Sequence, residues 1–129
     1  MQLRDLGEWD LLRRLAAYAP PGQFDDDAAL LNERSGRQLV VNTDVLVEGV
    51  HFSDATIGAR DLGWRAAAAN LSDLAAMGCT RVVGLTVALV APGDTRWDWV
   101  EGVYEGLRDG LAAYGGDRKS TRLNSSHRT

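Results

Sequence analysis

The stretch that decides the fold is QFDDDAALLNERSGRQLVVNTDVLVEGVHF, residues 23–52. Short apolar runs alternate in it with polar turns, and acidic residues stand where those runs begin or end. Asp25, Asp26 and Asp27 lead directly into an apolar segment, and Asp44 stands between two further apolar runs. Neighbouring carboxylates repel each other, and an apolar setting raises the free energy of their charged form. The stretch therefore raises the question of what compensates these charges.

The hydrophobic periodicity predicts an α+β, or mixed α/β, fold around this stretch. We expect strands at residues 28–31, 38–42, 45–52 and 81–90, where apolar and β-branched residues cluster between turn residues. A first helix is expected before the Pro20-Pro21-Gly22 stop, and a second from Ala59 to Met77 with Gly78 as its C-terminal cap.

A third helix should open at GDTRWDW, where Thr95 and Asp98 have the spacing of a capping box. Its apolar residues share one face: Trp97, Val100, Tyr104, Leu107, Leu111 and Tyr114. A helix that ends at YGG would normally feed another strand, and none follows in the sequence. We therefore expect an incomplete fold, truncated before its last strand.

Composition limits the classes of function. A chain of 129 residues is long enough for one domain with a modest core. The net charge of −4 argues against a nucleic-acid groove, and no apolar run approaches the roughly 20 residues that cross a bilayer. The single cysteine, Cys79, suits a reducing compartment. These features predict a cytoplasmic protein with neither nucleic acid nor membrane as a partner.

The composition changes abruptly at Asp117. Residues 1–116 hold ten arginines, no lysine and seventeen acids, a net charge of −7, whereas DRKSTRLNSSHRT is basic and nearly free of aliphatic residues. DRKSTRLNSSH also resembles the translation of a common sequencing adapter. We therefore treat residues 1–116 as one incomplete domain and expect residues 117–129 to be a non-native or disordered tail.

The acids pose a choice between a cation site and ordinary polar structure. Asp73 is the only charged residue between Arg65 and Arg81, on a helix of small and apolar side chains that must pack closely against something. Hard cations such as Mg2+ prefer oxygen ligands, usually a few carboxylates with water and substrate phosphate. Five residues could supply such a set: Asp27, Asn42, Thr43, Asp44 and Asp73. Alternatively, Asp73 marks a polar helix edge and Asn-Thr-Asp a hydrogen-bonded turn, and spacing alone leaves both readings open.

Several familiar chemistries are absent from the sequence. No phosphate-binding G-x-x-x-x-G-K-[ST] loop, G-x-S-x-G motif, paired cysteines or H-E-x-x-H occurs. His51 is the only histidine of residues 1–116 and by itself reads as a packed, hydrogen-bonded residue. If the chain handles phosphate, metal ions must neutralise most of the charge, as in phosphoryl transfer by positioning and electrostatics.

Four motifs in order, DDDAALL, NTDVLVEGVHF, NLSDLAAMG and GLTVALVAPG, resemble the N-terminal portion of thiamine-monophosphate kinase. The resemblance covers residues 1–116, and EGVHFSDATIGARDLGW is similar to cyanobacterial members. The wider superfamily includes aminoimidazole ribonucleotide synthetase and selenophosphate synthetase. The resemblance implies the N-terminal domain of that fold, lacking its C-terminal domain, and a homodimer formed through this domain.

The resemblance also implies an activity and a site. The activity is ATP-dependent phosphorylation of thiamine monophosphate to thiamine diphosphate, by direct transfer with several Mg2+ ions and no catalytic side chain. Asp27, Asn42, Thr43, Asp44 and Asp73 match metal-ligand positions. His51 matches the residue that contacts thiamine monophosphate, which reverses the reading given above, and Tyr104 matches a position near the nucleotide.

The sequence departs from the family at one turn, where Asp25 replaces a glycine, and in the missing chain after YGG. As it stands, we expect the fragment to be inactive alone. Two alternatives stay open. One is another ATP-dependent synthetase of the same superfamily, and the other is a non-catalytic dimerisation or metal-binding module that ends near residue 116.

Overall fold

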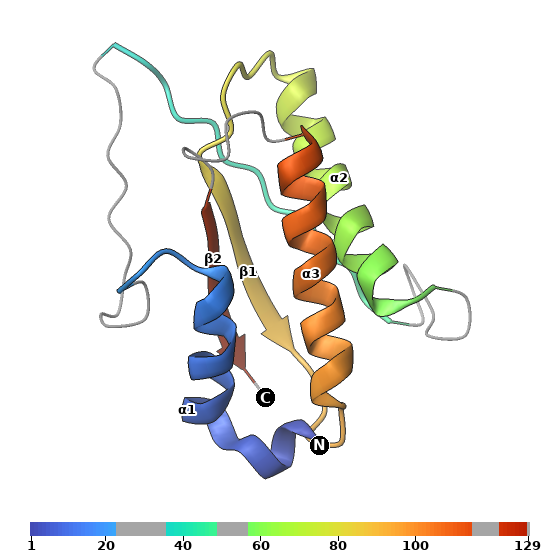
Figure 1. Cartoon of the computed structure of the whole chain (residues 1–129). Coiled ribbons are helices and arrows are strands. Elements are labelled where there is room, and N and C mark those ends of the chain that lie inside the picture. The colour runs from blue at the N-terminus through green and yellow to red at the C-terminus, as the bar shows by residue number, and fades with distance from the viewer. Residues whose placement is uncertain (23–35, 49–56, 115–121, 129) are drawn as a thin grey trace.

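The computed structural model of the chain describes residues 1–22, 36–48, 57–114 and 122–128 (Figure 1). The expected strand at residues 28–31 lies outside them. In chain order the elements are α1 (Leu3–Leu15), the short 3-10 helix η1 (Ala16–Tyr18), α2 (Ala59–Ala76), β1 (Gly84–Val90), α3 (Trp97–Tyr114) and β2 (Arg122–Arg128). Within these described ranges, no helix combines the length and the apolar character needed to cross a membrane.

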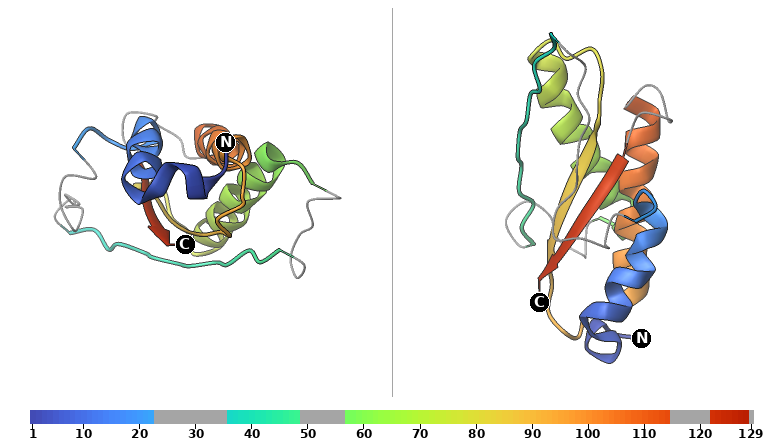
Figure 2. Two further views of the ribbon diagram at one scale, coloured as in Figure 1. Left: turned by 90° about the horizontal axis from the view of Figure 1, so that it is seen from below. Right: turned by 90° about the vertical axis from the view of Figure 1, so that its left-hand side faces the viewer.

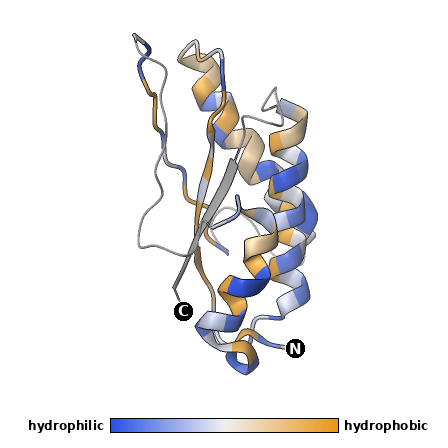
Figure 3. Ribbon diagram, turned by 60° about the vertical axis from the view of Figure 1, so that its left-hand side comes forward, coloured by the Kyte–Doolittle hydropathy of each residue, from blue (hydrophilic) through white to orange (hydrophobic). Residues whose placement is uncertain are grey.

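The elements form layers around β1. Helices α1 and α3 cover one side of this strand, and residues 36–48 run along the opposite side, as both views of Figure 2 show. The hydropathy colouring of Figure 3 shows a mixture of polar and apolar residues along α3 and a largely apolar second half of α2. The fold is mixed α/β, as the sequence predicts.

Helix α1 is bent at Gly7 and fastened at its start. Gly7 has φ 72° and ψ 169°, a left-handed backbone that only glycine adopts without strain. Backbone bonds of 2.8 Å join the Leu3 N–H to the Thr95 carbonyl and the Trp97 N–H to the Met1 carbonyl. The first residues of the chain therefore hold the loop that precedes α3.

The two central helices approach each other through small residues. A Cβ added at Gly63 or at Gly106 would overlap backbone atoms of the facing helix. Small residues recur every fourth position on both helices, Ala59, Gly63 and Ala67 on α2 and Gly102, Gly106 and Gly110 on α3. This spacing places each set on one side of its helix. The expectation that α2 packs closely against another element is confirmed, and that element is α3.

The predicted face of α3 is largely confirmed. Val100, Tyr104, Leu107 and Leu111 are buried, and the first three pack in one core with Leu11 and Leu15 of α1. At the end of the helix, Tyr114 is 57% exposed and packs edge-on against Trp64, with ring centroids 5.4 Å apart. Asp98 of the expected capping box forms an ion pair with Arg96, with an Nε to Oδ1 distance of 3.1 Å.

Strand β1 confirms part of the expected strand 81–90. Leu85, Val87 and Leu89 pack against the core, whereas Thr86, Ala88 and Val90 are exposed.

Helix α2 also matches its expected bounds closely, since Met77 is its C-cap and Gly78 has φ 76°.

The tail differs from the expectation of a disordered extension, because residues 122–128 form β2 parallel to β1, with Gly84 opposite Arg122. An unpaired strand edge offers a row of backbone donors and acceptors to any extended segment. The segment after α3 can therefore pair through its main chain, whatever its side chains. That residues 117–129 are non-native stays a prediction.

Two expected strands are wrong where the structure describes them. Residues 38–42 and 45–47 have no regular secondary structure, and Glu48 makes an isolated bridge. Val41 and Val45 are 78% and 60% exposed. β-branched residues favour a strand only when a partner edge and a packed face are available. In the described part of the chain the regular sheet consists of β1 and β2 alone.

A polar cluster fastens the end of η1 to α3. The Tyr18 hydroxyl donates to Glu105 Oε1 at 2.7 Å, and Arg108 Nη2 donates to Glu105 Oε2 at 2.6 Å. The Arg108 guanidinium also lies 4.9 Å from the Tyr18 ring centroid. The Tyr18 hydrogen bond, followed by Arg108, lowers the pKa of Glu105, and burial and the bond to Glu105 raise the pKa of Tyr18.

A pH-dependent loss of stability follows from Glu105. Because its pKa is lower in the folded chain, its contribution is present above the ordinary glutamate pKa and is lost as the pH falls through the folded value. We expect the thermal midpoint of Glu105→Gln to lie below that of the wild type at pH 7 and the gap to shrink as the pH falls below the ordinary glutamate pKa. Thermal unfolding followed by circular dichroism at several pH values measures the difference.

Glu8→Gln, at an exposed position of α1, controls for the change of net charge. A gap between Glu105→Gln and the wild type that stays constant from pH 7 to well below the ordinary glutamate pKa would contradict a contribution from the ionised carboxylate.

Candidate functional site

Helix α2 places Asp73 on an exposed part of its surface. The helix is buried through Leu62, Gly63, Ala67 and Leu71. Asn70, one turn earlier, turns its amide back to the Ala66 carbonyl at 2.8 Å. Packing against α3 therefore fixes the rotation of α2 and leaves the Asp73 carboxylate accessible.

The extended segment 36–48 brings a second set of oxygen-bearing side chains to α2. Asn42 Nδ2 donates to Asp73 Oδ2 at 3.4 Å, across a separation of 31 positions in the sequence. Thr43 and Asp44 follow on the same segment, and both are exposed. The tertiary structure thus joins two of the five predicted ligand positions and places two more directly beside them in the chain.

The Asp44 carboxylate already accepts one hydrogen bond from the neighbouring backbone. Its Oδ1 accepts the Val45 N–H at 2.9 Å, a local bond of the kind that the turn interpretation of Asn-Thr-Asp predicts. A carboxylate has two oxygens and about four acceptor sites, so this bond leaves capacity for another partner. The turn and the cation interpretations are therefore compatible at Asp44.

The donor chemistry of this group suits Mg2+. Carboxylate, amide and hydroxyl oxygens are the hard ligands that Mg2+ binds, usually together with water and substrate phosphate. Among the described residues, no three acidic, histidine or cysteine side chains lie together as a complete metal cage. The described part of the group consists of the contact between Asn42 and Asp73, with Thr43 and Asp44 next along the chain.

The remaining predicted residues are placed differently. Asp27 and His51, like the acids Asp25 and Asp26, lie outside the described residues. Tyr104 is fully buried, and its ring centroid is 5.5 Å from that of Tyr18. In this structure Tyr104 therefore belongs to the core between η1 and α3.

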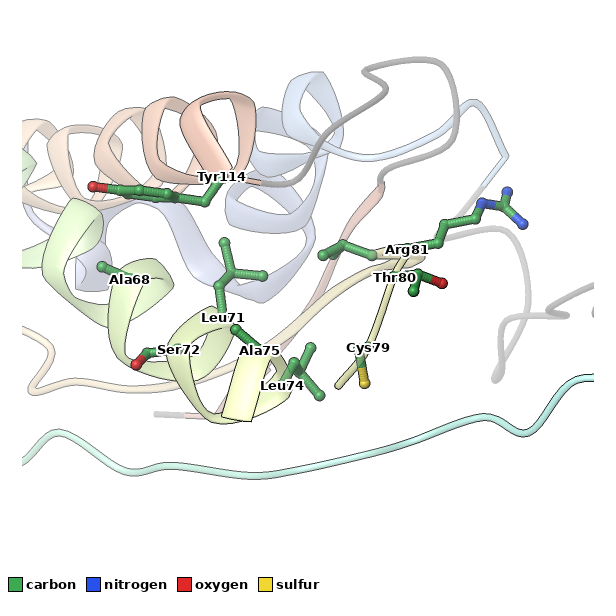
Figure 4. A pocket seen from close by; sticks show the side chains of 10 residues that line it. Ala68, Leu71, Ser72, Leu74, Ala75, Cys79, Thr80, Arg81 and Tyr114 are labelled. Atoms are coloured by element: carbon green, nitrogen blue, oxygen red, sulfur yellow. The ribbon is translucent and has the colours of Figure 1, made fainter. Parts of the chain in front are cut away.

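A pocket of about 500 Å³ lies beside the second half of α2 and was not predicted from the sequence. Most of its lining is small or apolar, including Leu71, Leu74 and Val82, and Tyr114 of α3 closes one side (Figure 4). The Arg81 side chain points away from it (Figure 4). None of the described residues of the predicted site lines it.

Comparison with known proteins identifies the chain's relatives. The family model described as AIR synthase related protein, N-terminal domain, matches residues 25–118. The chain is 50% identical over 114 residues to the thiamine-monophosphate kinase of Prochlorococcus marinus and 54% identical over 112 residues to that of Synechococcus elongatus. These matches cover 88% and 87% of this chain but 34% of each relative.

A more distant relative gives the same picture. The thiamine-monophosphate kinase of Escherichia coli is 40% identical over 114 residues, which cover 84% of this chain and 34% of that protein. The chain therefore spans about a third of the length of the relatives it matches. Because the family model matches most of its residues, the chain belongs to the AIR synthase related protein family, of which it carries the N-terminal domain.

Proposed function

We propose that the protein to which this chain belongs phosphorylates thiamine monophosphate to thiamine diphosphate with ATP and Mg2+. The observation that carries the proposal is the identity of 50–54% with proteins named thiamine-monophosphate kinase, over most of the chain. The contact between Asn42 and Asp73 supports it, because two residues from motifs of that family meet although they are distant in sequence.

The proposed site is built from oxygen ligands on two elements. Asp73 of α2 and Asn42, Thr43 and Asp44 of segment 36–48 would hold Mg2+, with Asp27 completing the set. When bound, Mg2+ would neutralise phosphate charge, a role that fits a body of residues 1–116 without lysine. His51 is the proposed contact to thiamine monophosphate. Catalysis would then rest on positioning and electrostatics, with no side chain as nucleophile.

Association and location are further parts of the proposal. We propose a homodimer formed through this domain, which the exposed apolar residues of segment 36–48 support, since a partner that covered them would remove their apolar area from water. Those residues are Leu39, Val40, Val41, Val45 and Val47. The proposed location is the cytoplasm, which the single cysteine suits. Tyr104, near the nucleotide by resemblance, would act on the site through the core in which it is buried.

The first test of the proposed function is ligand-dependent stability. A ligand that binds the folded chain raises its stability by mass action, by about 2.7 kcal/mol at a hundredfold excess over Kd. We expect Mg2+ with thiamine monophosphate to raise the thermal midpoint of the wild-type chain. Asp73→Ala and Asp44→Ala should each abolish the Mg2+-dependent part of this gain, because each removes a carboxylate ligand.

The matched control is Asp94→Ala, which removes an exposed carboxylate from the loop before α3. It should keep the gain. Retention of the gain in both Asp73→Ala and Asp44→Ala would refute the metal assignment. A wild-type chain without any gain would favour the alternative, a non-catalytic dimerisation module.

A further inference from the structure

In the hydrogen bond between Asn42 and Asp73, Asn42 is the donor and the Asp73 carboxylate is the acceptor. Asn42 uses Nδ2, its donor group, toward the carboxylate, which leaves Oδ1 as an acceptor that can still face another partner. An ionised carboxylate only accepts hydrogen bonds. The contact is therefore a donor–acceptor pair that forms without any cation.

The surroundings of Asp73 make this donor important. Asp73 is the only charged residue of α2 after Arg65, and the next charged residue in the chain is Arg81. Among the described residues, the Asn42 amide is the side-chain donor that reaches its carboxylate. Arg60, the other basic residue of α2, forms its ion pair with Asp109 of α3, with an Nη2 to Oδ2 distance of 2.6 Å.

The segment that carries Asn42 depends on such a contact. Residues 37–47 have no regular secondary structure, so a backbone ladder does not fix their position beside α2. A side-chain bond at Asn42 ties this segment to α2 immediately before Thr43 and Asp44. Holding those two residues near Asp73 in advance lowers the entropy lost when all of them engage one ligand.

We propose that Asn42 is a positioning residue, whose amide donates to Asp73 and holds Thr43 and Asp44 beside α2 before a cation binds. The proposal deepens the proposed function and rests on it for the identity of the cation. The metal-free contact itself does not depend on that function. It assigns to the amide nitrogen a role that a metal ligand, acting through its oxygen, does not have.

Asn42→Asp is the informative variant, because aspartate has the shape of asparagine but lacks the donor. In metal-free buffer two carboxylates would then face each other, and we expect the thermal midpoint of the 129-residue chain to fall by about 2–4 °C. Mg2+ should raise the midpoint of Asn42→Asp by more than that of the wild type, since a cation relieves the repulsion. A purely structural role would leave the size of the Mg2+ gain unchanged.

The exchanged pair supplies the rescue. Asn42→Asp combined with Asp73→Asn restores one amide and one carboxylate at the same two positions with the donor reversed. Its metal-free midpoint should recover most of the loss seen in either single variant. An unchanged midpoint in metal-free Asn42→Asp, or an exchanged pair no more stable than the single variants, would overturn the proposal.

The two proposals fail separately. If the wild type gains nothing from Mg2+ while metal-free Asn42→Asp is destabilised and the exchanged pair is rescued, the positioning contact stands and the proposed metal site loses its support. If the wild type gains from Mg2+ while metal-free Asn42→Asp matches it, the positioning role is refuted and the metal site remains.

Discussion

Gly106→Ala is expected to destabilise the chain by about 3 kcal/mol or to prevent it from folding. A Cβ at Gly106 would overlap the Arg60 carbonyl oxygen and lie 2.7 Å from the Trp64 backbone nitrogen. Both are main-chain atoms of α2, which cannot turn aside as a flexible side chain does. The two helices would have to separate, and separation would open the core.

Intrinsic helix propensity acts in the opposite direction, because by itself it would make Gly106→Ala stabilising. Alanine favours an isolated helix over glycine by about 1 kcal/mol, so a position without close contacts would be stabilised. The sign of the effect therefore reports the contact between α2 and α3. Urea unfolding followed by circular dichroism measures the change in the free energy of unfolding.

Gly93→Ala is the matched control, because its Cβ would meet the Arg4 Cβ at 3.5 Å, an ordinary van der Waals distance. It should change the stability by about 0.5 kcal/mol or less. Gly63→Ala, on the facing helix, should behave like Gly106→Ala, since its Cβ would overlap the Val103 carbonyl oxygen. Wild-type stability in both helix variants would contradict the close approach of the two helices.

Tyr104→Ala is expected to cost about 3–5 kcal/mol of folding free energy, the range for removing a large buried aromatic side chain. Tyr104 is fully buried and is among the largest such side chains of the core. Its ring packs against Tyr18 and links η1 to α3. The loss should appear in the absence of any nucleotide, in the same urea experiment.

Trp9→Ala provides the comparison with an exposed aromatic residue. Trp9 is 85% exposed on α1, so its removal should change the stability by about 0.5 kcal/mol or less. If Tyr104→Ala unfolds at the same urea concentration as the wild type, Tyr104 does not belong to the core. Its resemblance to a nucleotide-binding position would then be the better account of it.

The sequence predicted the helices well because their signals are local. The apolar residues of α3 recur with the helical period, and Gly78 marks the end of α2 by adopting a left-handed backbone. Gly102, Gly106 and Gly110 of α3 also recur every fourth residue. That spacing is a readable signal for close helix packing, and a facing row of small residues on α2 completes it.

The strands were harder to predict from the sequence because a strand forms only with a partner that is distant in the chain. Val40 and Val41 have the composition of a strand, yet residues 38–42 form none, whereas the polar segment Arg122–Arg128 pairs with β1. Side-chain preference did not decide the pairing in either case. A strand forms where an edge is available, and the sequence near the strand does not state which edge that is.

For the candidate site, the sequence alone determined the chemistry of the residues: oxygen donors in two motifs, no lysine to hold phosphate, and one charge on an otherwise small and apolar helix. Only the tertiary structure decided that Asn42 meets Asp73 and that Tyr104 is buried away from solvent. The physical reason is that residue type fixes which bonds a side chain can make. Packing of α2 against α3 fixes which side of the helix is left to make them.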